Sequence, residues 1–145
     1  MSKTKKSDRS ADQFAEFKEE LVRANERQYG AEVRQQYGDQ AMEVSNAWVR
    51  SLTPEHYSQG EQLRQELETT LQAALATGDP ASALAQQACD LHRQWLSVYY
   101  PHYSPAYHRG LAEMYVTDAR FRAYYDQIAP GCAEFLRDAI QIYCG

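Results

Sequence analysis

The chain has 145 residues, the length of one domain with a core of its own. Its formal net charge is −5, so a nucleic-acid partner is not expected for this domain. No apolar run approaches the roughly 20 residues that span a bilayer, no signal peptide is visible, and the three cysteines do not form a disulfide framework, so we expect a cytoplasmic protein with no membrane partner.

The first third of the chain predicts polar helices with few large apolar side chains. Residues 1–9 have a basic start and are expected to form a disordered tail, after which Ser10 is the predicted start of the first helix. Helix breaks are expected at Gly30 and Gly38. Because apolar positions are sparse, these helices should be only marginally stable alone, and we interpret residues 10–52 as a lid-like segment.

Residues 53–145 predict a stable helical core with short connections. Helix starts are indicated by a capping residue at Thr53, Asp79, Ser104 and Asp118. The helices before and after Gly78 meet in a tight turn and are expected to run antiparallel. The inward stripe predicted for the second of them consists of Leu84, Ala88, Leu91, Trp95 and Val98. The whole pattern predicts an all-α fold, an irregular bundle of about seven helices, with residues 10–145 as a single domain.

Aromatic residues are concentrated in one stretch. Nine of the 17 aromatic residues lie between Trp95 and Tyr125, and seven of those nine are tyrosines. A core built for stability alone would favour Leu, Ile and Val, because a buried phenol needs a hydrogen-bond partner. An aromatic wall with polar tips suits a cleft that holds a large, flat, partly polar molecule. The alternative is a tyrosine-rich helical core, and composition does not decide between the two.

Chemistry-bearing motifs are sparse. The sequence has no P-loop, no dinucleotide-binding or nucleophile-elbow motif, no H-E-x-x-H and no C-x-x-C, so neither an enzyme nor a cofactor is expected. Cys89 and His92 share a helix face, but two ligands do not make a metal site, and we interpret them as a small buried cysteine beside a hydrogen-bonded histidine. His102 and His108 flank a loop and could pair with a ligand or a carboxylate, although histidines in such positions are commonly solvated.

A long motif extends from His92 to Ile140. It consists of His92-Arg93, Tyr107-His108, Leu111-Ala112-Glu113-Met114-Tyr115-Val116-Thr117-Asp118-Ala119-Arg120-Phe121 and Pro130-Gly131-Cys132-Ala133-Glu134-Phe135-Leu136-Arg137-Asp138-Ala139-Ile140. Two shorter matches lie upstream, at residues 32–38 and 53–57. With these motifs, residues 29–143 resemble the TipAS-type antibiotic-recognition domain, the drug-binding half of certain MerR-family transcriptional regulators.

The resemblance implies a globin-like fold around a deep ligand cleft and a non-catalytic function. The implied partner is a small-molecule or macrocyclic peptide antibiotic, such as a thiopeptide, that is sensed or sequestered. Members that trap thiopeptides covalently carry cysteines at the positions matching Tyr103 and Gly110, and neither is cysteine here, so we expect reversible binding. The DNA-binding helices and coiled coil of MerR regulators are not in this sequence. We therefore expect either a trimmed effector domain, with any dimer formed only through a missing N-terminal region, or a stand-alone drug-binding protein.

The expected ligand contacts are aromatic, histidine and methionine side chains from both parts of the chain. They are Tyr37, Trp48, His92, Trp95, Tyr99, Tyr103, Tyr107, His108, Met114, Tyr115 and Tyr124. Two alternatives remain. One is a globin-like haem- or metal-binding sensor domain with His92 or His108 as the ligand, and the other is a structural interaction domain whose cleft is filled by its own side chains.

Overall fold

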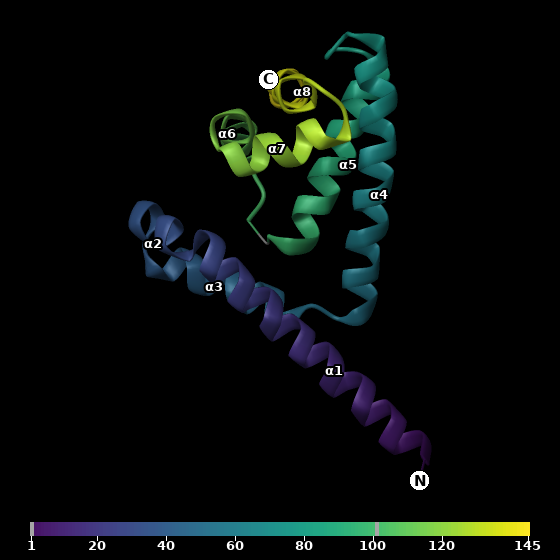
Figure 1. The fold of residues 1–145 in the computed structure, drawn as a ribbon, viewed down its shortest axis with the longest axis vertical. Helices are drawn as coiled ribbons and strands as arrows, with labels where there is room; N and C mark the ends of the chain where they lie inside the picture. The colour runs from purple at the N-terminus through teal and green to yellow at the C-terminus, as the bar shows by residue number, and fades with distance from the viewer. Residues whose placement is uncertain (1, 101) are drawn as a thin grey trace. The chain divides into compact units, whose positions relative to one another are not determined.

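The computed structural model describes residues 2–100 and 102–145, with side chains described from Ala11 onward. The elements in chain order are α1 (Ser2–Asn25), the π-helical turn η1 (Glu26–Gly30), α2 (Ala31–Tyr37), α3 (Asp39–Ser51), α4 (Pro54–Thr77), α5 (Ala83–Tyr99), α6 (Pro105–Thr117), α7 (Ala119–Ile128) and α8 (Cys132–Cys144) (Figure 1). The expected all-α fold class is confirmed, because the described residues contain helices and no strand. The globin-like comparison stays a prediction.

The chain divides into two compact units, Met1–Tyr57 and Ser58–Gly145, with the boundary inside α4. The sequence predicts a similar division at Thr53, between a lid-like segment and a core. Across the described residues, no helix combines the length and the apolar character that a membrane span requires.

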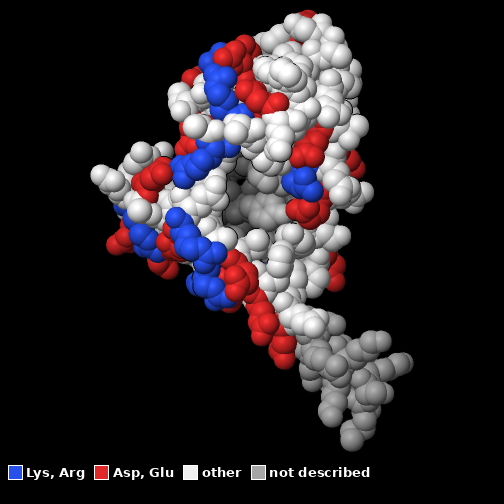
Figure 2. All heavy atoms as spheres, viewed as in Figure 1, with Lys and Arg blue, Asp and Glu red and all other residues white. Residues whose placement is uncertain are grey.

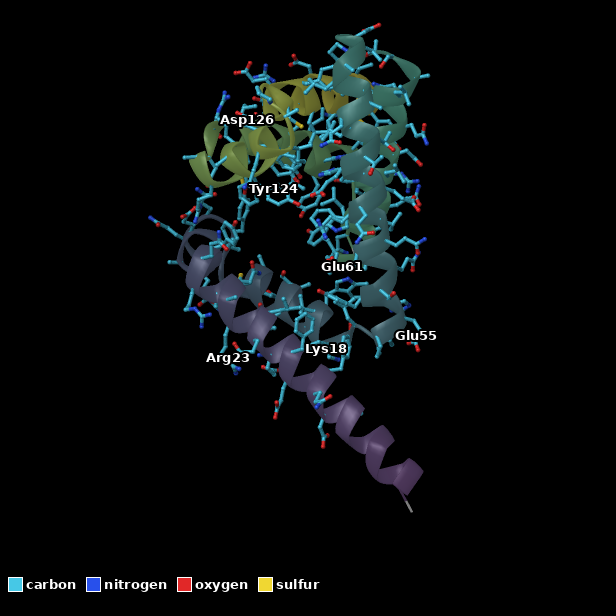
Figure 3. All side chains as sticks on the ribbon, turned by 45° about the vertical axis from the view of Figure 1, so that its right-hand side comes forward. Lys18, Arg23, Glu55, Glu61, Tyr124 and Asp126 are labelled. Carbon is cyan, nitrogen blue, oxygen red and sulfur yellow. The ribbon has the colours of Figure 1, made fainter. Side chains whose placement is uncertain are left out.

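The first unit has few buried apolar side chains, and polar contacts and a small aromatic cluster of Phe14, Phe17 and Tyr57 connect its elements. Its buried hydrophobic side chains, among those described, are Val22, Met42 and Leu52. Lys18 Nζ donates hydrogen bonds to the carbonyl oxygens of Arg50 (2.7 Å) and Leu52 (2.9 Å), which ties α1 to the end of α3 (Figure 3). Few apolar side chains are therefore available to stabilise this unit.

Two of the predicted helix boundaries in the first unit are wrong. The helical backbone of α1 begins at Ser2 and continues through Ser10, in a segment rich in lysine and arginine, which are good helix formers. Gly30 is not a break either, because η1 leads directly into α2 with Gly30 in a right-handed helical conformation. Gly38, with φ at 90°, does separate α2 from α3 as predicted. The disordered tail expected for residues 1–9 falls on positions whose side chains lie outside the described ones, and it stays a prediction.

Polar contacts within the first unit explain the π-helical turn at η1. Glu26 forms an ion pair with Arg34, and Asn46 Nδ2 donates to Glu26 Oε1 at 2.9 Å. The Glu26 carboxylate lies where a β-carbon on Gly30 would be, so Gly30 allows this close approach without breaking the helix. These partners come from α2 and α3, which is why local sequence patterns did not predict the turn.

The second unit is a core of α5 to α8 with α4 alongside. Helix α8 packs against α5, α6 and α7, and α4 runs antiparallel to α5, as the sequence predicted (Figure 1). The buried cluster comprises Leu67, Leu71, Ala74, Ala85, Ala88, Cys89, Ala112, Tyr115, Tyr125, Cys132, Ala133, Phe135, Leu136, Ala139 and Ile140. Small residues are numerous in this cluster, so the helices can approach closely and hold buried polar side chains at fixed distances.

Most of the predicted helix starts in this part of the chain are confirmed by their capping bonds. Thr53 Oγ1 accepts from His56 N (3.1 Å), Ser104 Oγ from Tyr107 N (3.1 Å) and Asp118 Oδ1 from Arg120 N (2.9 Å). Each side chain pairs a backbone N–H that would otherwise have no partner at the helix end.

The start predicted at Asp79 is wrong. Asp79 Oδ1 accepts from Ala81 N (2.9 Å) within a turn, and α5 begins only after Ser82, whose hydroxyl accepts from Ala85 N (3.1 Å). Leu84 therefore lies in the first turn of α5, where 38% of its surface is exposed, and does not belong to the inward stripe. Asp79 and Ser82 lie three positions apart and are both residue types that cap helices, so the local sequence does not decide which of them starts α5.

Charged side chains of both signs lie next to one another over the helices of the face shown in Figure 2. In the second unit, Arg122 pairs with Glu134 (2.8 Å) and Arg64 with Glu61 (3.0 Å). Solvent weakens such half-exposed pairs, so packing contributes more than charge to the stability of this unit.

Candidate functional site

Two histidines lie in the interior of the second unit. His92 is on α5 and His108 is on α6, and both side chains are fully buried. His92 Nδ1 and His108 Nε2 are 2.8 Å apart, and the rings are parallel to within 9° with centroids 4.9 Å apart. Atoms of rings stacked face to face cannot approach to 2.8 Å, so this contact is an N–H···N hydrogen bond close to the plane of both rings.

Helix geometry brings these side chains together. His108, Ala112 and Tyr115 are spaced i, i+4 and i+7, so one face of α6 directs all three inward, and each is buried. The Ser104 cap fixes the start of α6 one turn before His108. On α5, His92 lies on the same buried face as Ala88, one turn earlier.

Three tyrosines extend the histidine pair at its two ends. Tyr103 Oη lies 2.8 Å from His108 Nδ1. At the other end, Tyr115 Oη lies 3.1 Å and Tyr125 Oη 3.4 Å from His92 Nε2. We term these five side chains the His–Tyr chain. All four imidazole nitrogens in it have a protein partner within hydrogen-bond distance.

Burial controls the charge of the two rings. Loss of contact with water lowers the pKa of His92 to about 3, with the neighbouring His108 as the second cause. Burial, followed by the positive charge of Arg93, lowers the pKa of His108 to about 4. Both rings are therefore neutral near pH 7, and each carries a single N–H.

The interpretation of Cys89 and His92 as a structural pair is confirmed. Cys89 is fully buried, burial raises its pKa to about 12, and His92 is buried and hydrogen-bonded, as expected. His102 is exposed, whereas the solvated state and the carboxylate partner considered for His108 are wrong, and its contact with a ligand stays a prediction. His108 pairs with neither solvent nor a carboxylate but with a second histidine, because α5 and α6 enclose it.

The haem or metal alternative finds no support in this geometry. Coordination by His92 or His108 needs a free ring nitrogen, and every ring nitrogen of the two is engaged. Among the described residues, no three His, Cys, Asp or Glu side chains are grouped to hold a metal ion.

Trp95 and Tyr99 continue the aromatic region along α5. The Trp95 ring lies 5.8 Å from that of His92 and 5.5 Å from that of Tyr99, measured between centroids. Trp95 Nε1 is buried and has no hydrogen-bond partner. A buried donor without a partner is rare in folded proteins and costs free energy, so an acceptor that reached this N–H would be favoured.

The remaining predicted residues of the second unit lie around this centre. Tyr107 is half-buried and stacks on Tyr100, with ring centroids 4.3 Å apart. Met114 is half-buried against the core. Tyr124 projects from α7 (Figure 3), is 42% exposed and donates to Glu68 Oε1 at 2.9 Å. Its position at the edge of the unit is less suited to a buried ligand contact than that of Trp95.

Sequence reasoning missed two members of this region, Tyr100 and Tyr125. The sequence pattern predicts Tyr125 as an inward residue of its helix, but its hydroxyl reaches His92 only because α7 packs beside α6.

The two predicted residues of the first unit are Tyr37, which is 72% exposed, and Trp48, which is half-buried. Their participation in a common site with the second unit stays a prediction.

The second unit also has an open hollow of about 490 Å³ between α4 and α5. It is lined by Gln65, Glu66, Thr69, Thr70, Gln87 and Leu91. None of the predicted contacts lies in it, and none of its lining residues is aromatic, whereas the resemblance implied an aromatic cleft. Around the histidine pair, by contrast, the protein's own side chains fill the space.

Comparison with known proteins identifies relatives of the chain. The family model described as the TipAS antibiotic-recognition domain matches residues 29–143. The HTH-type transcriptional activator TipA of Streptomyces coelicolor is 37% identical over 117 residues, covering 78% of this chain and 46% of that protein. The HTH-type transcriptional activator mta of Bacillus subtilis is 29% identical over 135 residues, covering 92% of this chain and 51% of that protein. The chain thus spans about half the length of these relatives. No solved structure matches it.

Proposed function

Because this chain belongs to the TipAS antibiotic-recognition domain family, we propose that it binds a bulky aromatic or heterocyclic antibiotic without transforming it chemically. The observation that carries the proposal is the extent of the family match. Residues 29–143 include every side chain predicted to contact the ligand, from Tyr37 to Tyr124.

The chemistry of the aromatic region supports a macrocyclic peptide such as a thiopeptide as the ligand. Trp95, Tyr99 and Tyr107 offer flat apolar faces, and each well-placed ring contact adds roughly 0.5–1.5 kcal/mol beyond the area that it buries. The unpartnered Trp95 Nε1–H can donate to a carbonyl or ring-nitrogen acceptor, which such peptides carry in number. Binding would then satisfy a donor that the free protein leaves without a partner.

Two settings for this binding follow from the relatives. Their names describe HTH-type transcriptional activators, and this chain corresponds to about half of each. We propose that the chain acts as the effector domain of a MerR-type regulator, reporting the antibiotic to a DNA-binding region. The alternative is a stand-alone protein that sequesters the drug. Both settings require the same binding step.

A thermal-shift screen with a thiopeptide antibiotic and a panel of other antibiotics tests the binding step. A ligand at 100 times its dissociation constant adds about 2.7 kcal/mol to the free energy of unfolding, which raises the melting temperature by roughly 5–10 °C in a domain of this size. Absence of a shift with every class would favour the structural interaction domain, an alternative to which the self-filled core around the histidines lends weight.

Two matched variants locate the ligand. Trp95→Phe keeps an aromatic ring and removes the donor, and we expect about tenfold weaker binding because one hydrogen bond is lost. Thr69→Ala alters the lining of the hollow between α4 and α5 and should leave affinity unchanged. If Thr69→Ala weakens binding and Trp95→Phe does not, the ligand occupies the hollow and the aromatic site is wrong.

A further inference from the structure

One member of the His–Tyr chain differs from the others in exposure. His92, His108, Tyr115 and Tyr125 are all buried, whereas Tyr103, at the end of the loop before α6, is only half-buried. A molecule that binds at the surface of this unit can therefore change the hydrogen bonding of the His–Tyr chain through Tyr103.

The number of protons limits how the side chains of the His–Tyr chain can be hydrogen-bonded to one another. Each neutral ring has one N–H and one acceptor nitrogen. The 2.8 Å contact between His92 Nδ1 and His108 Nε2 needs one proton, no more and no fewer, since two would collide and none would leave two lone pairs facing each other. The tautomer of one ring consequently dictates the tautomer of the other.

Only two arrangements satisfy every link. In the inward arrangement, Tyr103 O–H donates to His108 Nδ1, His108 Nε2–H donates to His92 Nδ1, and His92 Nε2–H donates to Tyr115 or Tyr125. In the outward arrangement, each of these bonds runs in the opposite direction. Both rings are Nε2–H tautomers in the first and Nδ1–H tautomers in the second.

The two arrangements contain the same protons, one on each ring and one on each phenol, so no group changes charge. They interconvert when the cluster opens locally and the ring protons exchange with water. They differ in which hydrogen-bonding group of the Tyr103 hydroxyl remains free. In the inward arrangement its hydroxyl hydrogen is committed to His108, and an oxygen lone pair is free. In the outward arrangement its oxygen accepts from His108, and the hydrogen is free.

We propose that the His–Tyr chain lets Tyr103 present either an acceptor or a donor to the antibiotic, with both histidines changing tautomer together. The inference rests on the proposed function, and it makes Tyr103 a specificity-determining contact for amide groups, which offer an N–H or a C=O.

Histidine-selective ¹⁵N NMR of the ligand-free protein tests the coupling, because it reports the tautomer of each ring. We expect His92 and His108 to show the same tautomer ratio. Tyr103→Phe removes the partner of His108 Nδ1, and an orphaned buried N–H is less tolerated than an orphaned acceptor. Both rings should therefore shift toward Nε2–H, by about tenfold in tautomer ratio.

Removal of hydroxyls at the opposite end should have the opposite effect. In the Tyr115→Phe/Tyr125→Phe double variant, His92 Nε2 loses its partners, and both rings should shift toward Nδ1–H. Tyr100 is not part of the His–Tyr chain, so the Tyr100→Phe variant serves as the control. Should the double variant fail to give a folded proton spectrum, Tyr103→Phe decides by itself, because this substitution touches only His108 and coupling requires the ring of His92 to shift with it. Opposite tautomers in the two rings, or a response confined to the ring next to the mutation, would overturn the coupling.

Addition of a thiopeptide antibiotic tests the link to recognition. If it binds, the tautomer ratios of both rings should move in one direction, and Tyr103→Phe should weaken binding by about tenfold. A thiopeptide that binds with neither effect overturns the role of Tyr103. A protein that binds no antibiotic defeats the proposed function and this role with it, whereas the ligand-free spectra still decide whether the two rings are coupled.

Discussion

His92 and His108 have no contact with water, so their protonation is tied to the stability of the fold. The folded-state pKa values, about 3 and about 4, lie below the ordinary value of 6.5. Above about pH 7 neither the folded nor the unfolded state binds protons at these rings. As the pH falls below 6.5, the unfolded chain takes up two protons that the folded protein does not accept until about pH 4 and pH 3.

The free energy of unfolding should therefore fall by about 2–3 kcal/mol between pH 7 and pH 5.5, shared between the two histidines. Urea unfolding at the two pH values measures this difference. The carboxylates whose pKa values are lowered in the folded state, such as Asp90 and Asp118, contribute at lower pH, because their ordinary value is 3.8. His108→Gln should remove about half of the difference, and a pH-independent wild type would contradict the buried neutral pair.

The cysteines lead to a second prediction at this scale. Burial raises the pKa of Cys89 and of Cys132 to about 12, and burial also raises the pKa of Cys144. Thiols of this kind are poor nucleophiles. The Cys89→Ala/Cys132→Ala/Cys144→Ala variant should bind the antibiotic as the wild type does, and intact-mass spectra in denaturant should show no adduct for either.

A matched variant that adds a thiol sharpens the cysteine test. The resemblance implies that Gly110 matches a position where covalent family members carry cysteine. Gly110 is exposed, and a β-carbon added there would meet open space. Gly110→Cys should therefore fold normally and place a thiol in water. An adduct with a thiopeptide in this variant but not in the wild type would show that the ligand passes Gly110. An adduct with the wild type would refute reversible binding.

Residue roles were predictable where chemistry is local and unpredictable where burial depends on packing. The pairing of buried Cys89 with a hydrogen-bonded His92 follows from their spacing on one helix. The partner of His108 could not be inferred in this way, because it lies 16 residues away on another helix. The orphaned N–H of Trp95 likewise has no sequence signal, since the same residue pattern would arise with a partner present.

At the scale of helices, two glycines with different surroundings make a controlled comparison. A β-carbon on Gly60 of α4 would lie 2.6 Å from Tyr99 Oη and 3.1 Å from a carbon of its ring. Gly110 of α6 has open space at the same position. Alanine at Gly110 should stabilise the protein by about 0.5–1 kcal/mol, because glycine in a helix is entropically costly.

Alanine at Gly60 should leave the protein about 1–3 kcal/mol less stable than alanine at Gly110, because the helix gain is offset by a collision with Tyr99. Urea unfolding of the two variants gives this difference directly. Equal stability would mean that Tyr99 moves aside without cost and that α4 and α5 are not closely packed at this point.

Helix boundaries were likewise predictable where they depend on neighbouring residues and unpredictable where they depend on residues in other helices. The starts at Thr53, Ser104 and Asp118 depend on a side chain that caps its own helix, and the sequence predicts all three. The π-helical turn of η1 depends on Arg34 and Asn46, which lie in other helices, so local patterns indicate a break where the chain remains helical.

At the scale of the molecule, the two units differ in what stabilises them. The buried hydrophobic residues of the first unit, among described side chains, are Val22, Met42 and Leu52, whereas most of the apolar core lies in the second unit. Ion pairs such as Arg50 with Glu19 are half-exposed, so solvent weakens them and they add little to stability. The first unit should therefore open more readily than the second.

Hydrogen exchange measures that difference and its functional consequence together. In the ligand-free protein, amides between Phe14 and Trp48 should exchange faster than those between Leu84 and Ile140, because fewer buried apolar contacts oppose local opening.

We propose that the first unit is a lid that becomes ordered when the antibiotic binds, at a cost of about 2–5 kcal/mol of the contact energy. Saturating thiopeptide should then slow exchange mainly in the first set, while the second set serves as the internal reference. A regulator needs such a difference, because a ligand with equal affinity for two states shifts neither. Equal protection of both sets before ligand is added would mean that the chain has no lid, and that any signal must arise within the second unit.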